Sequence, residues 1–177
     1  LLLALGLAAP VRPLNGQDAD PLDAALLANR STVELRDGRV GGDGGELLLR
    51  EGRSSQSFLI GEEHGVAEIP LLTSALFRAL APEGYGYLAI ETGDGIARAL
   101  EARAGAAEPM ESLVRFYEDH WPGAPFYTLR PEARLLVDAV AAGGRLWGLD
   151  YDVMADRHAL DRLLELAESP GERAMVE

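Results

Sequence analysis

The residues of this chain that are best suited to chemistry follow three short apolar segments. Glu62 and His64 come after the first segment, Glu91 after the second and Asp150 after the third. A histidine beside carboxylates can take a proton from water while a carboxylate fixes the histidine tautomer. The same oxygen and imidazole atoms can hold a divalent metal ion. These residue types therefore predict general-base catalysis, a metal site, or both.

The three apolar segments are predicted to be strands that bring these side chains together. They are Ser57–Ile60, Tyr85–Ile90 and Arg145–Leu149, and each carries few charges, as is typical of strands buried on both faces. Ligands of open parallel α/β sheets bind beyond the carboxyl ends of the strands. If the three strands are parallel neighbours, the carboxylates and the histidine converge on one edge of the sheet.

Helical patterns separate the predicted strands. Apolar residues recur at helical spacing over 69–80, over 110–117 and after Pro131, and Gly143 and Gly144 end the last of these patterns. Strands that alternate with helices favour βαβ units. The predicted fold class is α/β, with a parallel or mixed central sheet and flanking helices.

The two ends of the chain are predicted to differ from this core. Residues 1–20 read as a signal-peptide remnant and linker, because an apolar run ends in small residues before Pro10, Pro13 and Gly16. Residues 21–177 form the predicted α/β domain. Within it, 32–35 favours an edge strand, 41–45 a glycine-rich turn and 46–50 a short helix. The helical pattern over 155–177 ends with no closing strand, so we expect the N-terminal part of a larger domain.

The composition narrows the classes of function. The 177 residues suit one domain, and 16 basic against 29 acidic residues give a formal charge of −13. Such a chain is repelled by nucleic acids and anionic membranes, so we expect a small-molecule ligand or substrate and no nucleic-acid partner. All basic residues are arginines and there is no cysteine, which excludes lysine Schiff bases and cysteine nucleophiles.

The N-terminal apolar run also predicts where the protein resides. The run is too short to span a bilayer, so no stable membrane insertion is expected after removal of the signal. A signal peptide implies export, to the periplasm or the extracellular space.

Several candidate residues also have purely structural interpretations. Asp94, Asp150 and Asp152 each precede a predicted helix and are typical of N-caps. His120 stands at a helix end, where it can bind free carbonyls. Aromatic residues near 117–127 either line a pocket beside the site or fix a loop to the core.

Three motifs together resemble a known superfamily. The turn Gly61-Glu62-Glu63-His64 after an apolar run, the strand end at Glu91 and the Gly-x-Asp strand end at Asp150 occur in the same order. They are similar to erythromycin esterases, ChaN-like haem-binding lipoproteins and the TIKI metalloproteases. The resemblance covers roughly 57–152.

The resemblance implies an α/β core with its site at the strand ends. It implies a hydrolase in which His64, Glu62 and Glu91 activate water, or bind a divalent metal together with Asp150. One alternative is a binding module for haem, a metal or a small ligand that performs no turnover. Another is a domain that keeps the fold but has lost activity.

Overall fold

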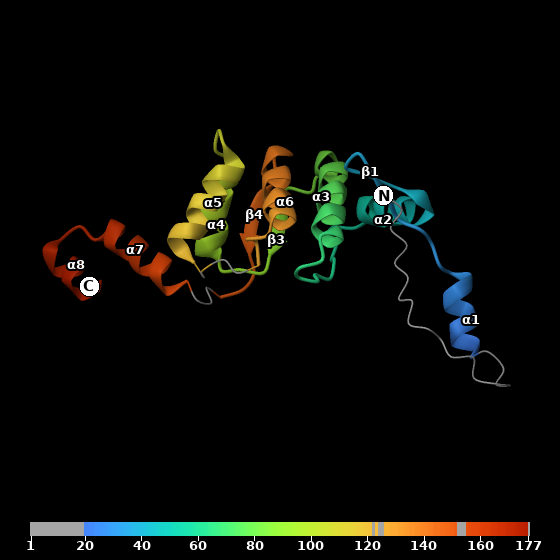
Figure 1. Cartoon of the computed structure of the whole chain (residues 1–177), viewed down its shortest axis with the longest axis horizontal. Helices are drawn as coiled ribbons and strands as arrows, with labels where there is room; N and C mark the ends of the chain where they lie inside the picture. Colours follow the sequence, from blue (N-terminus) through green and yellow to red (C-terminus); the bar gives the residue numbers. More distant parts are fainter. Residues whose placement is uncertain (1–19, 122, 124–125, 152–154, 177) are drawn as a thin grey trace.

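The computed structural model of the chain describes residues 20–121, 123, 126–151 and 155–176. The predicted signal-peptide remnant lies outside these residues, apart from its last position. Within the described part, no helix is both long enough and apolar enough to cross a bilayer. The elements are spread along one long axis, with α1 (Pro21–Ala28) at one end and α7 (Asp156–Leu166) and α8 (Pro170–Val176) at the other (Figure 1).

The last two predicted strands form and pair as expected. β3 (Tyr87–Ile90) and β4 (Arg145–Gly148) are parallel neighbours, with Tyr87 opposite Arg145 and Ile90 opposite Gly148. The connection between them contains α4 (Asp94–Ala104), α5 (Pro109–His120) and α6 (Arg130–Ala141). The two strands therefore end at the same edge, which places the residues after them side by side.

The prediction of a strand at Ser57–Ile60 is wrong. The segment forms neither helix nor strand and pairs with no strand among the described residues, and Leu59 is 95% exposed. Its neighbours Phe58 and Ile60 are half-buried against a small cluster that includes Leu49 and Leu76. Phe58 and Ile60 are thus covered by α2 (Gly42–Ser54) and α3 (Glu68–Leu80) instead of by a sheet.

The fold is mixed α/β and mostly helical, with two-stranded sheets in the described part. The predicted α/β class is therefore matched only coarsely. The strands are short, and the described residues form no large central sheet.

A β-hairpin precedes the helical part of the chain. β1 (Glu34–Arg36) pairs antiparallel with β2 (Arg39–Gly41), and Asp37 and Gly38 between them have positive φ values of 50° and 70°. Asp-Gly is a common choice for such a two-residue turn.

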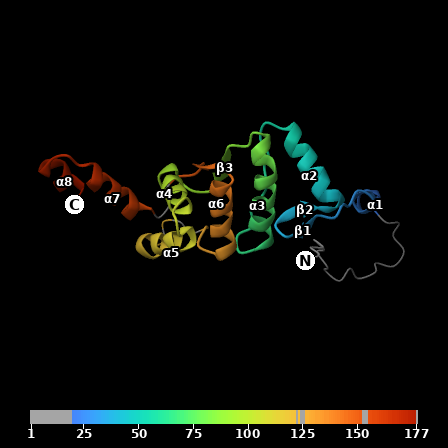
Figure 2. The same ribbon diagram turned by 90° about the horizontal axis from the view of Figure 1, so that it is seen from above.

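The glycine-rich segment after the hairpin was predicted to be a turn, and this is wrong. Gly42 already begins α2, which lies beside the hairpin (Figure 2). A Cβ atom at Gly45 would lie 2.7 Å from a methyl group of Val40, and one at Gly44 would lie 3.0 Å from the backbone of Thr32. The glycines therefore permit close packing of the helix on the hairpin.

The predicted helix over 69–80 is confirmed as α3. It ends in a short 3-10 turn, η1 (Ala81–Glu83), and Gly84 follows with a φ of 111°, a conformation that favours glycine. α3 lies beside α6 in both views (Figures 1 and 2).

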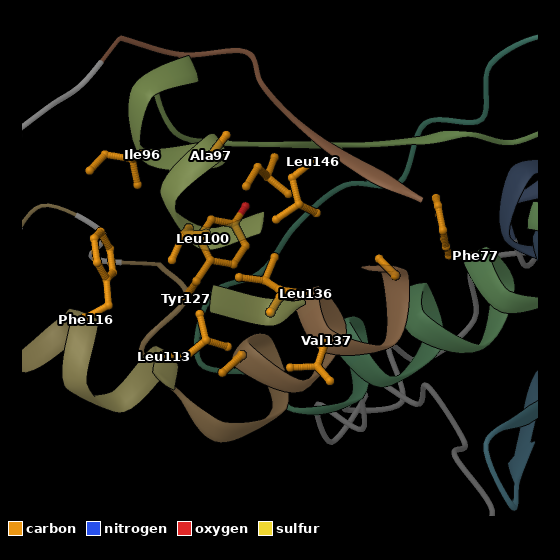
Figure 3. Packing of buried hydrophobic residues seen from close by; sticks show 14 of the residues in the cluster. Phe77, Ile96, Ala97, Leu100, Leu113, Phe116, Tyr127, Leu136, Val137 and Leu146 are labelled. Atoms are coloured by element: carbon orange, nitrogen blue, oxygen red, sulfur yellow. The ribbon is translucent and has the colours of Figure 1, made fainter. Parts of the chain in front are cut away.

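The main hydrophobic core lies between β3–β4 and the helices that connect them (Figure 3). Its largest fully buried side chains come from three helices: Ile96 and Leu100 of α4, Leu113 and Phe116 of α5, and Leu136 of α6. Leu146 of β4 is also buried in this core. The alternating side chains on the other face of the sheet, Tyr87, Trp147 and Leu149, are exposed. The sheet is therefore covered on one face by the described residues.

Gly148 brings the end of β4 against the start of α4. A Cβ atom there would lie 2.5 Å from both the carbonyl carbon and the carbonyl oxygen of Gly93. Directly after this contact, the amides of Leu149 and Asp150 donate to the carbonyls of Ile90 and Thr92 at 3.1 and 3.0 Å. The pairing of β3 with β4, which positions Glu91, therefore requires glycine at position 148.

We predict that Gly148→Ala destabilises the protein by about 1–3 kcal/mol, because the backbone of Gly93 must move. Gly86→Ala is the matched control, since a Cβ atom there would meet nothing within 4 Å and Gly86 lies just before β3. Urea unfolding of both variants measures the difference. Equal stabilities would show that the Gly148 contact is not a packing constraint.

Candidate active site

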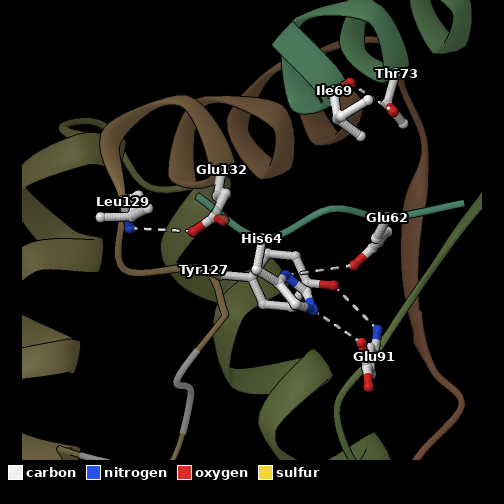
Figure 4. Close-up of polar contacts among 8 residues, drawn as sticks. All are labelled: Glu62, His64, Ile69, Thr73, Glu91, Tyr127, Leu129 and Glu132. Carbon is white, nitrogen blue, oxygen red and sulfur yellow. Dashed lines mark hydrogen bonds and ion pairs between the residues drawn. The ribbon is translucent and has the colours of Figure 1, made fainter. Parts of the chain in front are cut away.

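The structure brings Glu62, His64 and Glu91 together. Glu62 and His64 lie in the loop between α2 and α3, and Glu91 directly follows β3. His64 Nε2 is 3.1 Å from Glu91 Oε2, and His64 Nδ1 is 4.0 Å from Glu62 Oε2 (Figure 4). Among the described residues, these three form the set of His, Asp and Glu ligand atoms that all lie within 4.8 Å of one another.

The contact with Glu91 decides which nitrogen of His64 can act as a base. An ionised carboxylate can only accept a hydrogen bond, so Nε2 is the nitrogen that carries the proton in the neutral ring. The lone pair is then on Nδ1, which faces Glu62. The ring is also held from one side, because it stacks on Phe126 with a centroid distance of 4.1 Å and an interplanar angle of 11°.

Tyr127 connects the two carboxylate residues. Its side chain is 2% exposed, and its hydroxyl oxygen accepts a hydrogen bond of 3.0 Å from the amide of Glu91. The same hydroxyl also faces the carboxylate of Glu62 and acts to lower its pKa. Burial, and then the charge of Glu62, raises the pKa of Tyr127, so the hydroxyl keeps its proton and remains able to donate to Glu62.

A third carboxylate, Glu132, lies next to the site and was not among the predicted residues. It is 8% exposed, and its Oε2 accepts a 3.3 Å hydrogen bond from the amide of Leu129 at the start of α6. The sequence signal was available: a glutamate in the first turn of a helix, after a proline, is typical of a side chain that binds a free amide.

The surroundings of Glu62 make its charge unfavourable. Burial is the largest cause of its raised pKa, and the charges of Glu91 and Glu132 add to the effect. His64 and the hydroxyl of Tyr127 act in the opposite direction without cancelling it. A carboxyl group with a raised pKa beside a histidine is typical of sites that move protons.

Glu62, His64, Tyr127 and Glu132 line a small recess between α3, the start of α6 and the loop that joins α2 to α3. The space open to the centre of a water molecule is about 20 Å³, whereas one water needs about 10–15 Å³. The recess therefore has room for one water molecule or one metal ion. Its lining residues are Glu62, Glu63, His64, Ile69, Pro70, Thr73, Phe126, Tyr127, Glu132 and Leu135.

Other sequence candidates lie outside this set. Asp150 is the fourth predicted metal ligand, but its Oδ1 accepts a 2.8 Å hydrogen bond from the amide of Tyr151. Asp94 is the first residue of α4, where it pairs with Arg98, and Gly93 occupies the N-cap position. Asp152 lies outside the described residues. The site therefore uses the first and second predicted segment ends and not the third.

Comparisons with family models, curated proteins and solved structures give no significant match. What the site can do is therefore argued from its own geometry.

The raised pKa of Glu62 predicts how stability changes with pH. A carboxyl group whose folded-state pKa lies above its ordinary value of 4.5 binds its proton more tightly in the folded state. As the pH rises from the ordinary pKa of 4.5 through the raised folded-state pKa, ionisation of Glu62 therefore lowers the stability of the folded protein. We expect Glu62→Gln to be more stable than the wild type at pH 7, with the difference shrinking as the pH approaches 4.5.

Urea unfolding at several pH values measures this difference. Glu111→Gln is the control, because Glu111 is an exposed carboxylate paired with Arg115 and its loss should matter little at any pH. A Glu62→Gln variant less stable than the wild type at pH 7 would show that the charge of Glu62 stabilises the fold.

Proposed function

We propose that this chain is a hydrolase domain in which His64 activates a water molecule held between its Nδ1 atom and Glu62. One observation carries the proposal: Glu91 occupies Nε2 at 3.1 Å, while Nδ1 and a carboxylate oxygen of Glu62 face each other across 4.0 Å. Both facing atoms accept hydrogen bonds, and a water molecule can donate to both. The recess around them has the volume for one water.

Each residue has a distinct part in the proposed reaction. His64 Nδ1 takes a proton from the water, and the hydroxide oxygen attacks the carbonyl carbon of the substrate. The imidazolium that forms lies between the carboxylates of Glu91 and Glu62, which stabilise its charge. As the tetrahedral intermediate collapses, the proton returns from His64 to the leaving group.

The other contacts keep this arrangement in place. Tyr127 holds the backbone of Glu91 and faces the Glu62 carboxylate, and the stacked ring of Phe126 restricts the rotation of His64. Such positioning is a large part of enzymatic rate enhancement. The substrate class that we propose is a small ester or amide, in line with the motif resemblance and with a net charge that disfavours polyanions.

A second candidate function is binding of a divalent metal by the same three residues. Two carboxylates and an imidazole whose ligand atoms lie within 4.8 Å are a suitable donor set. A bound metal would lower the pKa of its water. His64, Glu62 and Glu91 would hold the ion, and Tyr127 would orient Glu62. A haem has no comparable support, since the recess beside His64 has the volume of about one water.

Hydrolysis of a panel of small aryl esters and lactones tests the first proposal. We expect His64→Ala to lower kcat/KM by about 10²–10⁴-fold, the usual contribution of a general base. Glu91→Gln should cost at least about tenfold, because an amide can donate to Nε2 and favour the wrong tautomer. Glu111→Gln should keep full activity. Turnover that survives in His64→Ala would reject His64 as the base.

Metal content of the protein purified without chelator tests the second candidate. We expect the wild type to carry one equivalent more of divalent metal than His64→Ala, whereas Asp150→Asn should equal the wild type because Asp150 lies outside the set. Equal metal content in the wild type and His64→Ala would reject this set as a metal site.

A further inference from the structure

A second group of metal-ligating side chains lies where α5 ends and α7 begins. It comprises His120 at the last position of α5 and His158 and Asp161 on α7. Both helices lie towards the α8 end of the molecule (Figure 1). None of these residues lines the recess at His64, so the group is separate from the site of the proposed function.

The ring of His120 is fixed in one orientation. It stacks on Phe116 with a centroid distance of 4.6 Å, and its Nδ1 lies 3.1 Å from the carbonyl oxygen of the same residue. A carbonyl can only accept a hydrogen bond, so Nδ1 carries the proton and the lone pair is on Nε2. Metal-binding histidines commonly hold their second ring nitrogen on a carbonyl in this way.

His120 Nε2 faces a carboxylate across a gap. Asp161 Oδ2 is 4.0 Å away, which is too far for a hydrogen bond. With the neutral ring, both facing atoms carry lone pairs, so a positive charge between them is favourable. Arg157 Nε forms an ion pair with the same oxygen at 3.9 Å, beyond hydrogen-bond distance, so a metal ion would replace this arginine as the cation beside Asp161.

His158 is a third side chain of metal-binding type close to these two. It precedes Asp161 by three residues, a spacing that places the two side chains next to each other on a helix. Its ring lies edge-on to the His120 ring, with a centroid distance of 5.2 Å and an interplanar angle of 78°. The ligand atoms of this group lie farther apart than the 4.8 Å that spans those of Glu62, His64 and Glu91. His158 must therefore rotate about its side-chain bonds to complete the site.

We propose that His120, His158 and Asp161 bind a divalent ion of the zinc class and thereby clamp α7 onto α5. Two imidazoles and one carboxylate are ligands that zinc accepts, with water in the remaining position. The formal charge of −13 favours a cation over an anion at this junction. The site would be structural, because it joins two helices that are distant in the sequence.

Zinc titration of the metal-free full chain tests the proposal. His64 is the only histidine of the chain outside this group, so His64→Ala is a background in which zinc binding reports on the second site. We expect isothermal calorimetry to give one zinc per chain in that background. Adding His158→Asn should abolish binding, and adding Asp161→Asn should weaken it at least about tenfold.

Glu165→Gln in the same background is the matched control, because Glu165 is an exposed carboxylate of α7 that pairs with Arg162. It should leave the zinc affinity unchanged. Circular dichroism and the Tm without metal show whether each variant keeps its fold, and zinc should raise the Tm of His64→Ala but not of His64→Ala/His158→Asn.

Two results would overturn the proposal: no zinc binding by His64→Ala, or zinc binding that neither His158→Asn nor Asp161→Asn changes. Both readouts use a chain that lacks the proposed general base, so they are independent of whether His64 supports hydrolysis.

Discussion

The parallel pairing of β3 with β4 is the constraint on which the rest of the structure depends. Leu146 and Ile90 on the inner face of this pair contribute to a core shared with α4, α5 and α6. Gly148 lets the end of β4 lie directly against Gly93, and the amides that follow continue the pairing past the ends of the strands. The backbone that carries Glu91 is therefore held from two sides before any side chain of the site is considered.

The site combines this rigid support with a more exposed loop. Glu91 is fixed by its backbone, whereas Glu62 and His64 belong to a loop outside the sheet. Tyr127 and Phe126, which lie just before α6, compensate for this, because one hydrogen-bonds the amide of Glu91 and faces the carboxylate of Glu62, and the other stacks on the imidazole. Buried Glu132 adds negative charge next to the loop and contributes to the raised pKa of Glu62. The surroundings of Glu62 thus make its charged form costly for the folded state, a feature that is common at functional sites.

Local patterns were sufficient for the elements that are defined by their own sequence. The strands near 85–90 and 145–149 and the helices over 69–80 and after Pro131 form where apolar periodicity and proline or glycine signals place them. The three-residue set at Glu62, His64 and Glu91 was predicted from its place after two apolar segments, although the same reasoning also included Asp150, which lies outside the set. Local patterns were insufficient where tertiary packing decided the structure. Phe58 and Ile60 pack on helices and not in a sheet. The glycines of 42–45 begin a helix that packs on the hairpin.

The sequence by itself determined which groups are available for chemistry: one histidine between glycines, carboxylates at the ends of apolar segments, and neither lysine nor cysteine. Tertiary structure alone decided which of these groups meet. It turned Asp150 to a local backbone contact, brought Tyr127 between Glu62 and Glu91, and placed buried Glu132 next to them. The reason is that hydrogen bonds and charge interactions act over a few ångströms, and the distances between these residues are fixed by packing of segments far apart in the chain.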